Sequence, residues 1–171
     1  MSRLSRADWA ALGRSVLAEE GPAALTVARV CERAGRTRGS LYHHFADHDA
    51  LLRAVLESWR TESTDALIAA HPPGEGATAG LDGSARGLDF KLEQNVRRLV
   101  ANRAEFKPLV AGVDADRVAH LVRLHTHEGM SLKDARMRAQ IEYAAFLGFQ
   151  QLDPPPQRLR DLYRWMNPRL R

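Results

Sequence analysis

Apolar residues recur at helical spacing along this chain, whereas residues 5–69 contain no stretch with the period of two that a strand requires. The first predicted helix covers residues 5–20, between a capping-box serine and the Gly21-Pro22 pair. Beyond the short helices described next, helices are predicted over 47–69, 85–103, 114–128, 131–152 and 157–167, with a short helical turn around 105–111. The pattern therefore predicts an all-α protein.

Two short helices joined by a tight turn are predicted near the N-terminus. The first lies between Thr26, a suitable N-cap, and Gly35, a typical C-terminal glycine. Thr37 caps the next helix within two residues, and Leu41 and Phe45, four positions apart, form its inward face. This arrangement is typical of a helix-turn-helix that reads DNA.

The run TRGSLYHHF, residues 37–45, places Gly39 inside a helix. A glycine there costs roughly 1 kcal/mol relative to alanine. Without a Cβ the helix backbone can approach a base edge or a methyl group closely, and the hydroxyls of Thr37 and Ser40 can donate hydrogen bonds to phosphates. We interpret Gly39 as a point of close approach to DNA.

Residues 25–56, LTVARVCERAGRTRGSLYHHFADHDALLRAVL, resemble the DNA-binding region of the tetracycline-repressor-like (TetR) family of bacterial transcription regulators. The shared features are Leu25-Thr26, Ala34-Gly35, the run from Thr37 to Tyr42, His44-Phe45, and an acid followed by leucines at the start of the fourth helix. The resemblance covers about residues 5–60. It implies a ligand-responsive regulator, most commonly a repressor, and not an enzyme.

The resemblance assigns Tyr42 to a phosphate contact, and helical spacing places Arg38 and His43 toward base edges or the nearby backbone in the major groove. Thr26 adds donors at the N-terminus of its helix. The predicted DNA-contacting residues are Thr26, Arg36, Thr37, Arg38, Gly39, Ser40, Tyr42, His43, His44 and His48.

Two positions depart from the family pattern. Arg36 replaces a small apolar residue in the turn, and it either supplies phosphate-binding charge or points to solvent. His48 replaces a frequent phosphate-binding lysine, so weaker anchoring is expected there because histidine is at most partly charged at neutral pH.

The predicted domain organisation follows from these motifs. Residues 1–46 are expected to form the DNA-binding domain, and residues 47–171 a helical domain for effector binding and dimerisation. Within the second domain, residues 47–69 are the connecting helix, and residues 71–84, rich in glycine and proline, are a flexible loop.

A homodimer is expected because one short reading helix touches only a few base pairs. The helix over 131–152 is apolar nearly all round, so it must be covered on more than one side, and small residues on one stripe permit close approach of another helix. The helix over 131–152 and an apolar stripe on the last helix, over 157–167, are predicted to pair with their copies in the partner as a four-helix bundle. The interface residues are Ile141, Ala144, Ala145, Gly148, Leu152, Leu159, Leu162, Tyr163 and Met166.

The resemblance also implies a small-molecule effector that binds among the C-terminal helices, shifts the fourth helix, and releases a palindromic operator. Four residues are candidates for the pocket, although ordinary core packing explains each of them as well: Trp59, His125, Tyr143 and Phe146. No cofactor is expected. His125 and His127 diverge around a helix, so no metal site is predicted, and no catalytic motif is found.

Composition narrows the class further. No apolar run approaches the roughly 18 residues of a membrane span, no signal peptide is expected, and the single cysteine, Cys31, favours the reducing cytoplasm, with the protein on the nucleoid when DNA is bound. Residues 1–45 carry seven arginines against four acidic residues, as expected for a phosphate-binding surface. The alternative is a helical protein-interaction module that keeps the helix-turn-helix without reading DNA.

Overall fold

The computed structural model describes residues 3–74 and 88–152, together with residues 158 and 161. These residues contain helices and no strand, which confirms the predicted all-α fold. The chain divides into two compact units: Met1–Ser63 with Asp89–Val110, and Thr64–Leu88 with Ala111–Arg171. This division follows packing, whereas the boundary after residue 46 is a prediction about function and stays one.

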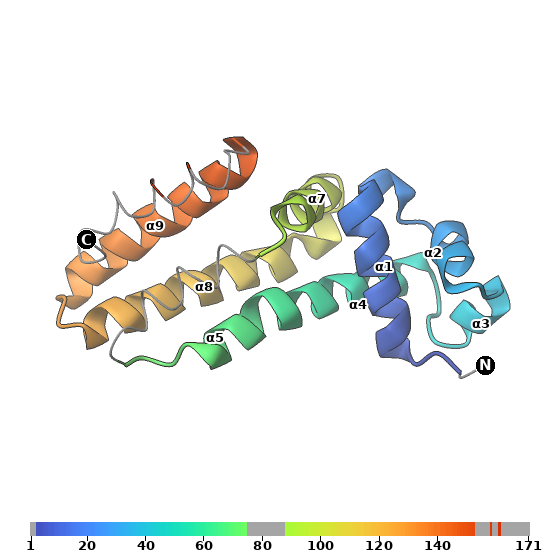
Figure 1. Ribbon diagram of the computed structural model, residues 1–171, viewed down its shortest axis with the longest axis horizontal. Coiled ribbons are helices and arrows are strands. Elements are labelled where there is room, and N and C mark those ends of the chain that lie inside the picture. The colour runs from blue at the N-terminus through green and yellow to red at the C-terminus, as the bar shows by residue number, and fades with distance from the viewer. Residues whose placement is uncertain (1–2, 75–87, 153–157, 159–160, 162–171) are drawn as a thin grey trace. The chain divides into compact units, whose positions relative to one another are not determined.

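The first unit contains the predicted N-terminal helices. They are α1 (Arg6–Glu20), the 3₁₀ turn η1 (Pro22–Ala24), α2 (Val27–Ala34), α3 (Arg38–Tyr42) and α4 (His48–Arg60). The unit is completed by α7 (Phe90–Ala101) and the 3₁₀ turn η3 (Ala104–Phe106). In Figure 1, α1 contacts α2, α4 and α7, and α2 contacts α3.

The predicted caps are present. The Ser5 hydroxyl accepts a hydrogen bond from the Asp8 amide at 3.2 Å, and the Asp8 carboxylate accepts one from the Ser5 amide at 2.8 Å, which completes the capping box. At the starts of α2, α3 and α4, the side chains of Thr26, Thr37 and Asp47 each accept a hydrogen bond from the amide three residues later. These side chains satisfy amides that a helix cannot pair by itself, so each helix begins where the sequence predicts.

The expected helix over 47–69 is not continuous. α4 ends at Arg60, a π-helical segment η2 covers Thr61–Asp65, and α5 covers Ala66–Ala70. The Ser63 hydroxyl donates to the Trp59 carbonyl oxygen at 2.6 Å, and such back-bonding is common where a helix is irregular.

The second unit holds α5, most of α8 (Lys107–His127) and α9 (Leu132–Leu152). α8 begins at Lys107, seven residues before the predicted start at 114. Pro108 does not prevent this start, since a proline is tolerated in the first turn of a helix. α9 confirms the prediction for 131–152, with Ser131 and Asp134 hydrogen-bonded at its start. Residues 75–84 of the expected loop and nearly all of the expected helix over 157–167 lie outside the described residues.

α1 and α4 pack closely at Gly13, inside a core that includes Trp9, Leu17 and Leu56. A Cβ at Gly13 would lie 2.5 Å from Val55 Cγ2, which is closer than two carbon atoms can approach. Valine is branched at Cβ and strongly restricted in χ1, so it cannot swing aside. The glycine is therefore required by packing.

Gly13→Ala is expected to lower the free energy of unfolding, because overpacking a core costs about 1–3 kcal/mol and the helical gain on replacing glycine by alanine returns at most about 1 kcal/mol of it. Urea unfolding followed by circular dichroism measures this difference. A variant as stable as the parent chain would contradict the close packing of α1 on α4.

Candidate DNA interface

The turn between α2 and α3 begins at Gly35, whose backbone is left-handed with φ 60° and ψ 39°. Glycine adopts this conformation at little cost. The amides of Gly35 and Arg36 then donate to the carbonyl oxygens of Glu32 and Cys31 at 3.1 and 3.0 Å, which closes the end of α2. Thr37 starts α3 two residues later, so the predicted helix-turn-helix is confirmed.

α3 is anchored by one apolar face. Leu41 and Phe45 are 0% and 2% exposed, and the Thr37 hydroxyl accepts from the Ser40 amide at 3.3 Å. Around these anchors, the other predicted contact residues of this segment lie at the surface: Thr37, Arg38, Gly39, Ser40, Tyr42 and His43 are exposed, and His44 is half-buried. Tyr42 is 49% exposed, an uncommon degree for a large aromatic side chain. The structure therefore brings these residues together on one polar surface.

The fold itself does not require a glycine at position 39. A Cβ built there would meet only the Thr37 hydroxyl oxygen, at 3.8 Å, which is an ordinary contact distance. Gly39 also has a helical backbone that any residue could adopt, since it is not among the glycines with positive φ. At Gly13 a neighbouring side chain leaves no space for a Cβ. Among the described residues, no atom lies that close to Gly39.

Two predicted contact residues also have structural roles. The Thr26 hydroxyl oxygen accepts from the Arg29 amide at 3.2 Å, which leaves its own proton for another acceptor. His48 Nε2 lies 2.8 Å from the Leu25 carbonyl oxygen, which can only accept, so Nε2 carries the hydrogen. In a neutral ring the other nitrogen is then an acceptor, and His48 could donate to a phosphate through it only when the ring is protonated.

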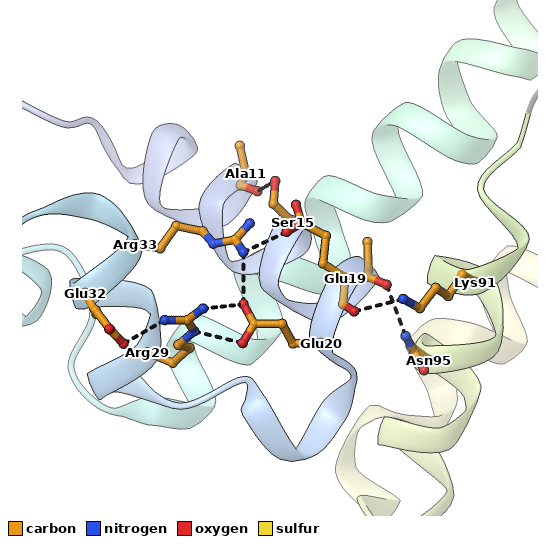
Figure 2. A network of polar contacts seen from close by, with 10 residues as sticks. Ala11, Ser15, Glu19, Glu20, Arg29, Glu32, Arg33, Lys91 and Asn95 are labelled. Carbon is orange, nitrogen blue, oxygen red and sulfur yellow. Dashed lines mark hydrogen bonds and ion pairs between the residues drawn. The ribbon is translucent and has the colours of Figure 1, made fainter.

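Two of the seven arginines in residues 1–45, Arg29 and Arg33 of α2, form ion pairs within the protein. Arg29 contacts Glu20 and Glu32 at 2.8 Å, and Arg33 contacts Glu19 at 2.7 Å and Glu20 at 2.9 Å (Figure 2). A hydrogen bond from Arg29 lowers the pKa of Glu20, and one from Arg33 lowers the pKa of Glu19. These carboxylates stay ionised at neutral pH, so the cluster joins α1 to α2 rather than adding net charge to the exposed face of α3.

α7 holds the C-terminal end of α1. Lys91 Nζ donates to the Glu19 carbonyl oxygen at 2.8 Å, and Asn95 Nδ2 donates to that of Leu17 at 2.8 Å (Figure 2). α7 also contacts α4, because Trp59 Nε1 donates to Glu93 Oε1 at 2.8 Å, with both side chains 1% exposed. Trp59, a predicted pocket residue, is therefore a hydrogen-bonded core residue of the first unit.

The other predicted pocket residues lie in the second unit. His125 Nε2 lies 2.6 Å from Glu142 Oε2, the Tyr143 hydroxyl donates to Asp114 Oδ1 at 2.6 Å, and the Tyr143 and Phe146 rings stack with centroids 5.9 Å apart. Their roles in effector binding stay predictions.

Sequence reasoning missed a buried arginine in this unit. Arg117 is 7% exposed, and its Nε donates to the Thr64 hydroxyl at 2.9 Å. Its Cζ lies 5.9 Å from the centroid of the Phe146 ring. The available signal was its spacing, because Arg117 lies on the same helical stripe as the buried Val113, His120 and Leu124. Burial, with the charges of Arg123 and His71, lowers the pKa of His120 and favours its neutral form.

α9 has one buried and one exposed apolar face. Ala135, Ala139, Tyr143, Phe146 and Gln150 are buried. The predicted interface residues Ile141 and Leu152 are 64% and 77% exposed, Ala144 is exposed, and Ala145 and Gly148 are half-buried. Met137 extends the same stripe and is 55% exposed. The remaining predicted interface residues, Leu159, Leu162, Tyr163 and Met166, lie outside the described residues.

Within residues 3–74 and 88–152 no group of three or more His, Cys, Asp or Glu side chains could hold a metal ion. In the same part of the chain no helix is both long enough and apolar enough to cross a membrane.

Comparison with known proteins identifies the N-terminal region. Residues 11–55, from within α1 to within α4, match the family described as bacterial regulatory proteins, tetR family. A crystal structure of BioQ with its natural double-stranded DNA operator is 22% identical, covers 98% of this chain and 94% of that chain, and has a TM-score of 0.48. No curated protein matches the chain.

The first unit thus contains a helix-turn-helix of the type found in DNA-binding regulators. Residues 11–55 are thus similar to the tetR family of bacterial regulatory proteins, and this match covers the N-terminal region of the chain alone.

Gly39→Ala is expected to change stability and DNA affinity in opposite directions. The added methyl group has space in the free protein and removes the helical penalty of glycine, so the free energy of unfolding rises by up to about 1 kcal/mol. If Gly39 faces a base, DNA binding weakens by about 1–3 kcal/mol, as for loss of one good base contact. Thermal unfolding and fluorescence anisotropy measure the two effects. Unchanged affinity in a stabilised variant would contradict the close approach.

Proposed function

We propose that this chain reads a palindromic operator as a homodimer and that a small-molecule effector releases it, most simply as a repressor in the bacterial cytoplasm. The observation that carries the proposal is the polar outer face of α3, held in place by the buried Leu41 and Phe45. Tyr42 and Thr37 bind phosphates in this proposal, while Arg38, Gly39 and His43 face base edges.

The exposed stripe of α9 supports the proposed dimer. A second copy of the chain is the occupant to which we assign it, because leaving Met137, Ile141 and Leu152 in water is unfavourable, and the small Ala144 and Gly148 between them allow close helix approach. Among the residues that the structure describes, no atom would lie within 4 Å of a Cβ at Gly148. A twofold pair would present two α3 helices to half-sites roughly 34–36 Å apart.

The effector is proposed to bind in the second unit, near His125, Tyr143 and Phe146. A ligand that binds more tightly to the conformation unable to span two half-sites shifts the population toward that conformation. DNA binding is weakened as a result, and the coupling free energy between ligand and DNA is the same in both directions. Arg117 and Thr64 place a cation and a hydroxyl in the same buried interior, which gives an effector polar partners there.

The proposed function is tested by fluorescence anisotropy with a duplex from the region upstream of the chain's own gene and a scrambled duplex. We expect preferential, salt-sensitive binding to the upstream duplex. Tyr42→Phe, which removes only the exposed hydroxyl, is expected to cost about 1.5 kcal/mol, close to tenfold in affinity. Circular dichroism checks that the Tyr42→Phe variant is folded. Equal, salt-insensitive binding to both duplexes would favour the interaction-module alternative.

The dimer has a separate test. Ile141→Glu places a charge on the exposed stripe and is expected to convert a dimer into a monomer in equilibrium sedimentation at micromolar concentration. Gln140→Glu adds the same charge at the neighbouring exposed position and is expected to leave the dimer intact. A parent chain that sediments as a monomer would overturn the dimer.

A further inference from the structure

A small hollow lies on the first unit between the N-terminal segment and α3. Its volume is about 240 Å³, and it is lined by Arg3, Leu4, Trp9, Arg36, Ser40, His43 and His44. Pockets for drug-sized ligands are usually roughly 300–1,000 Å³, so this hollow suits a smaller group. We refer to it as the basic hollow.

The chemistry of the lining favours an anion. Arg3 and Arg36 contribute guanidinium groups, His43 and His44 contribute imidazoles, and Ser40 contributes a hydroxyl, while none of these lining residues is acidic. Trp9 is 1% exposed and closes the hollow from inside the core. A group with several acceptor oxygens and a negative charge matches these donors.

Arg3 is held beside α3 by a contact between its Nη2 and Nε2 of His43. Arginine can only donate, so this ring nitrogen is the acceptor, and a neutral His43 carries its proton on Nδ1. A guanidinium has five N–H donors in a fork that suits phosphate, and among the described residues the contact with His43 occupies one of them. Arg3 is exposed, so a phosphate can reach it from solvent.

We propose that the basic hollow binds a backbone phosphate of DNA and that Arg3 is a DNA-contacting residue. This inference rests on the proposed function, because the phosphate is one beside the bases that α3 reads. His43, which faces base edges in that proposal, and Ser40, which is exposed on α3, line the hollow together with Arg3. The sequence does not indicate this role, because Arg3 precedes both the helix-turn-helix and the region matched by the family.

The experiment measures the dissociation constant of the full-length protein for the upstream and the scrambled duplex over a series of salt concentrations. The variants are Arg3→Ala, Arg3→Lys and, as a matched control, Arg136→Ala, which removes the same charge from an exposed position in the second unit. Circular dichroism checks that each variant is folded. Arg3 is exposed, so no loss of fold is expected.

With a phosphate in the basic hollow, Arg3→Ala reduces the slope of log affinity against log salt by about one for each hollow that binds DNA. It weakens binding to both duplexes by the same factor, several-fold at near-physiological salt, because a phosphate contact carries no sequence information. Arg3→Lys keeps the charge and is expected to retain most of the slope, and Arg136→Ala is expected to match the parent chain.

Three outcomes overturn the inference. If Arg3→Ala behaves like Arg136→Ala while the parent chain prefers the upstream duplex, the hollow binds no phosphate and the proposed function stands. If Arg3→Ala weakens only the upstream duplex and leaves the salt slope unchanged, Arg3 contacts a base instead. If the parent chain binds neither duplex with a salt dependence, both this inference and the proposed function fail.

Discussion

A helix of five residues is not stable in isolation, because it cannot recover the cost of its nucleation. α3 has that length, and therefore everything it presents depends on how it is anchored. Leu41 and Phe45 bury its inner face, Gly35 sets the turn before it, and Thr37 caps it. Because the inner face of α3 makes the packing contacts, its outer face can carry polar residues that are not needed for folding.

The contacts around α1 extend this anchoring through the first unit. Glu20 joins α1 to α2 through Arg29, and Asn95 joins α1 to α7 by donating to a carbonyl oxygen at the C-terminal end of α1 (Figure 2). Trp59 and Glu93 join α4 to α7 inside the core. A displacement of α7 would therefore act on α1 and α4 together, and α1 contacts α2, which in turn contacts α3. This arrangement suits a domain whose reading helix must keep a defined position.

The helices, their caps and the outward residues of α3 were predictable because they follow from local periodicity and capping chemistry. Contacts between distant residues were not. A count of arginines could not show that Arg29 is paired within the protein, nor could spacing show that His48 binds the Leu25 carbonyl oxygen. Arg3 carries no local signal, since only the fold brings it to His43. The early start of α8 was missed because a separate short turn was predicted around 105–111, ahead of a helix from 114.

The exposed face of α3 is proposed to bind specific DNA. Hydrogen–deuterium exchange of the full-length chain, with and without a duplex selected for binding, tests this directly because amide exchange reports local protection along the chain. We expect slower exchange in residues 26–48 with the selected duplex and little change there with a scrambled one. Protection confined to α8 and α9, or the same protection by both duplexes, would contradict it.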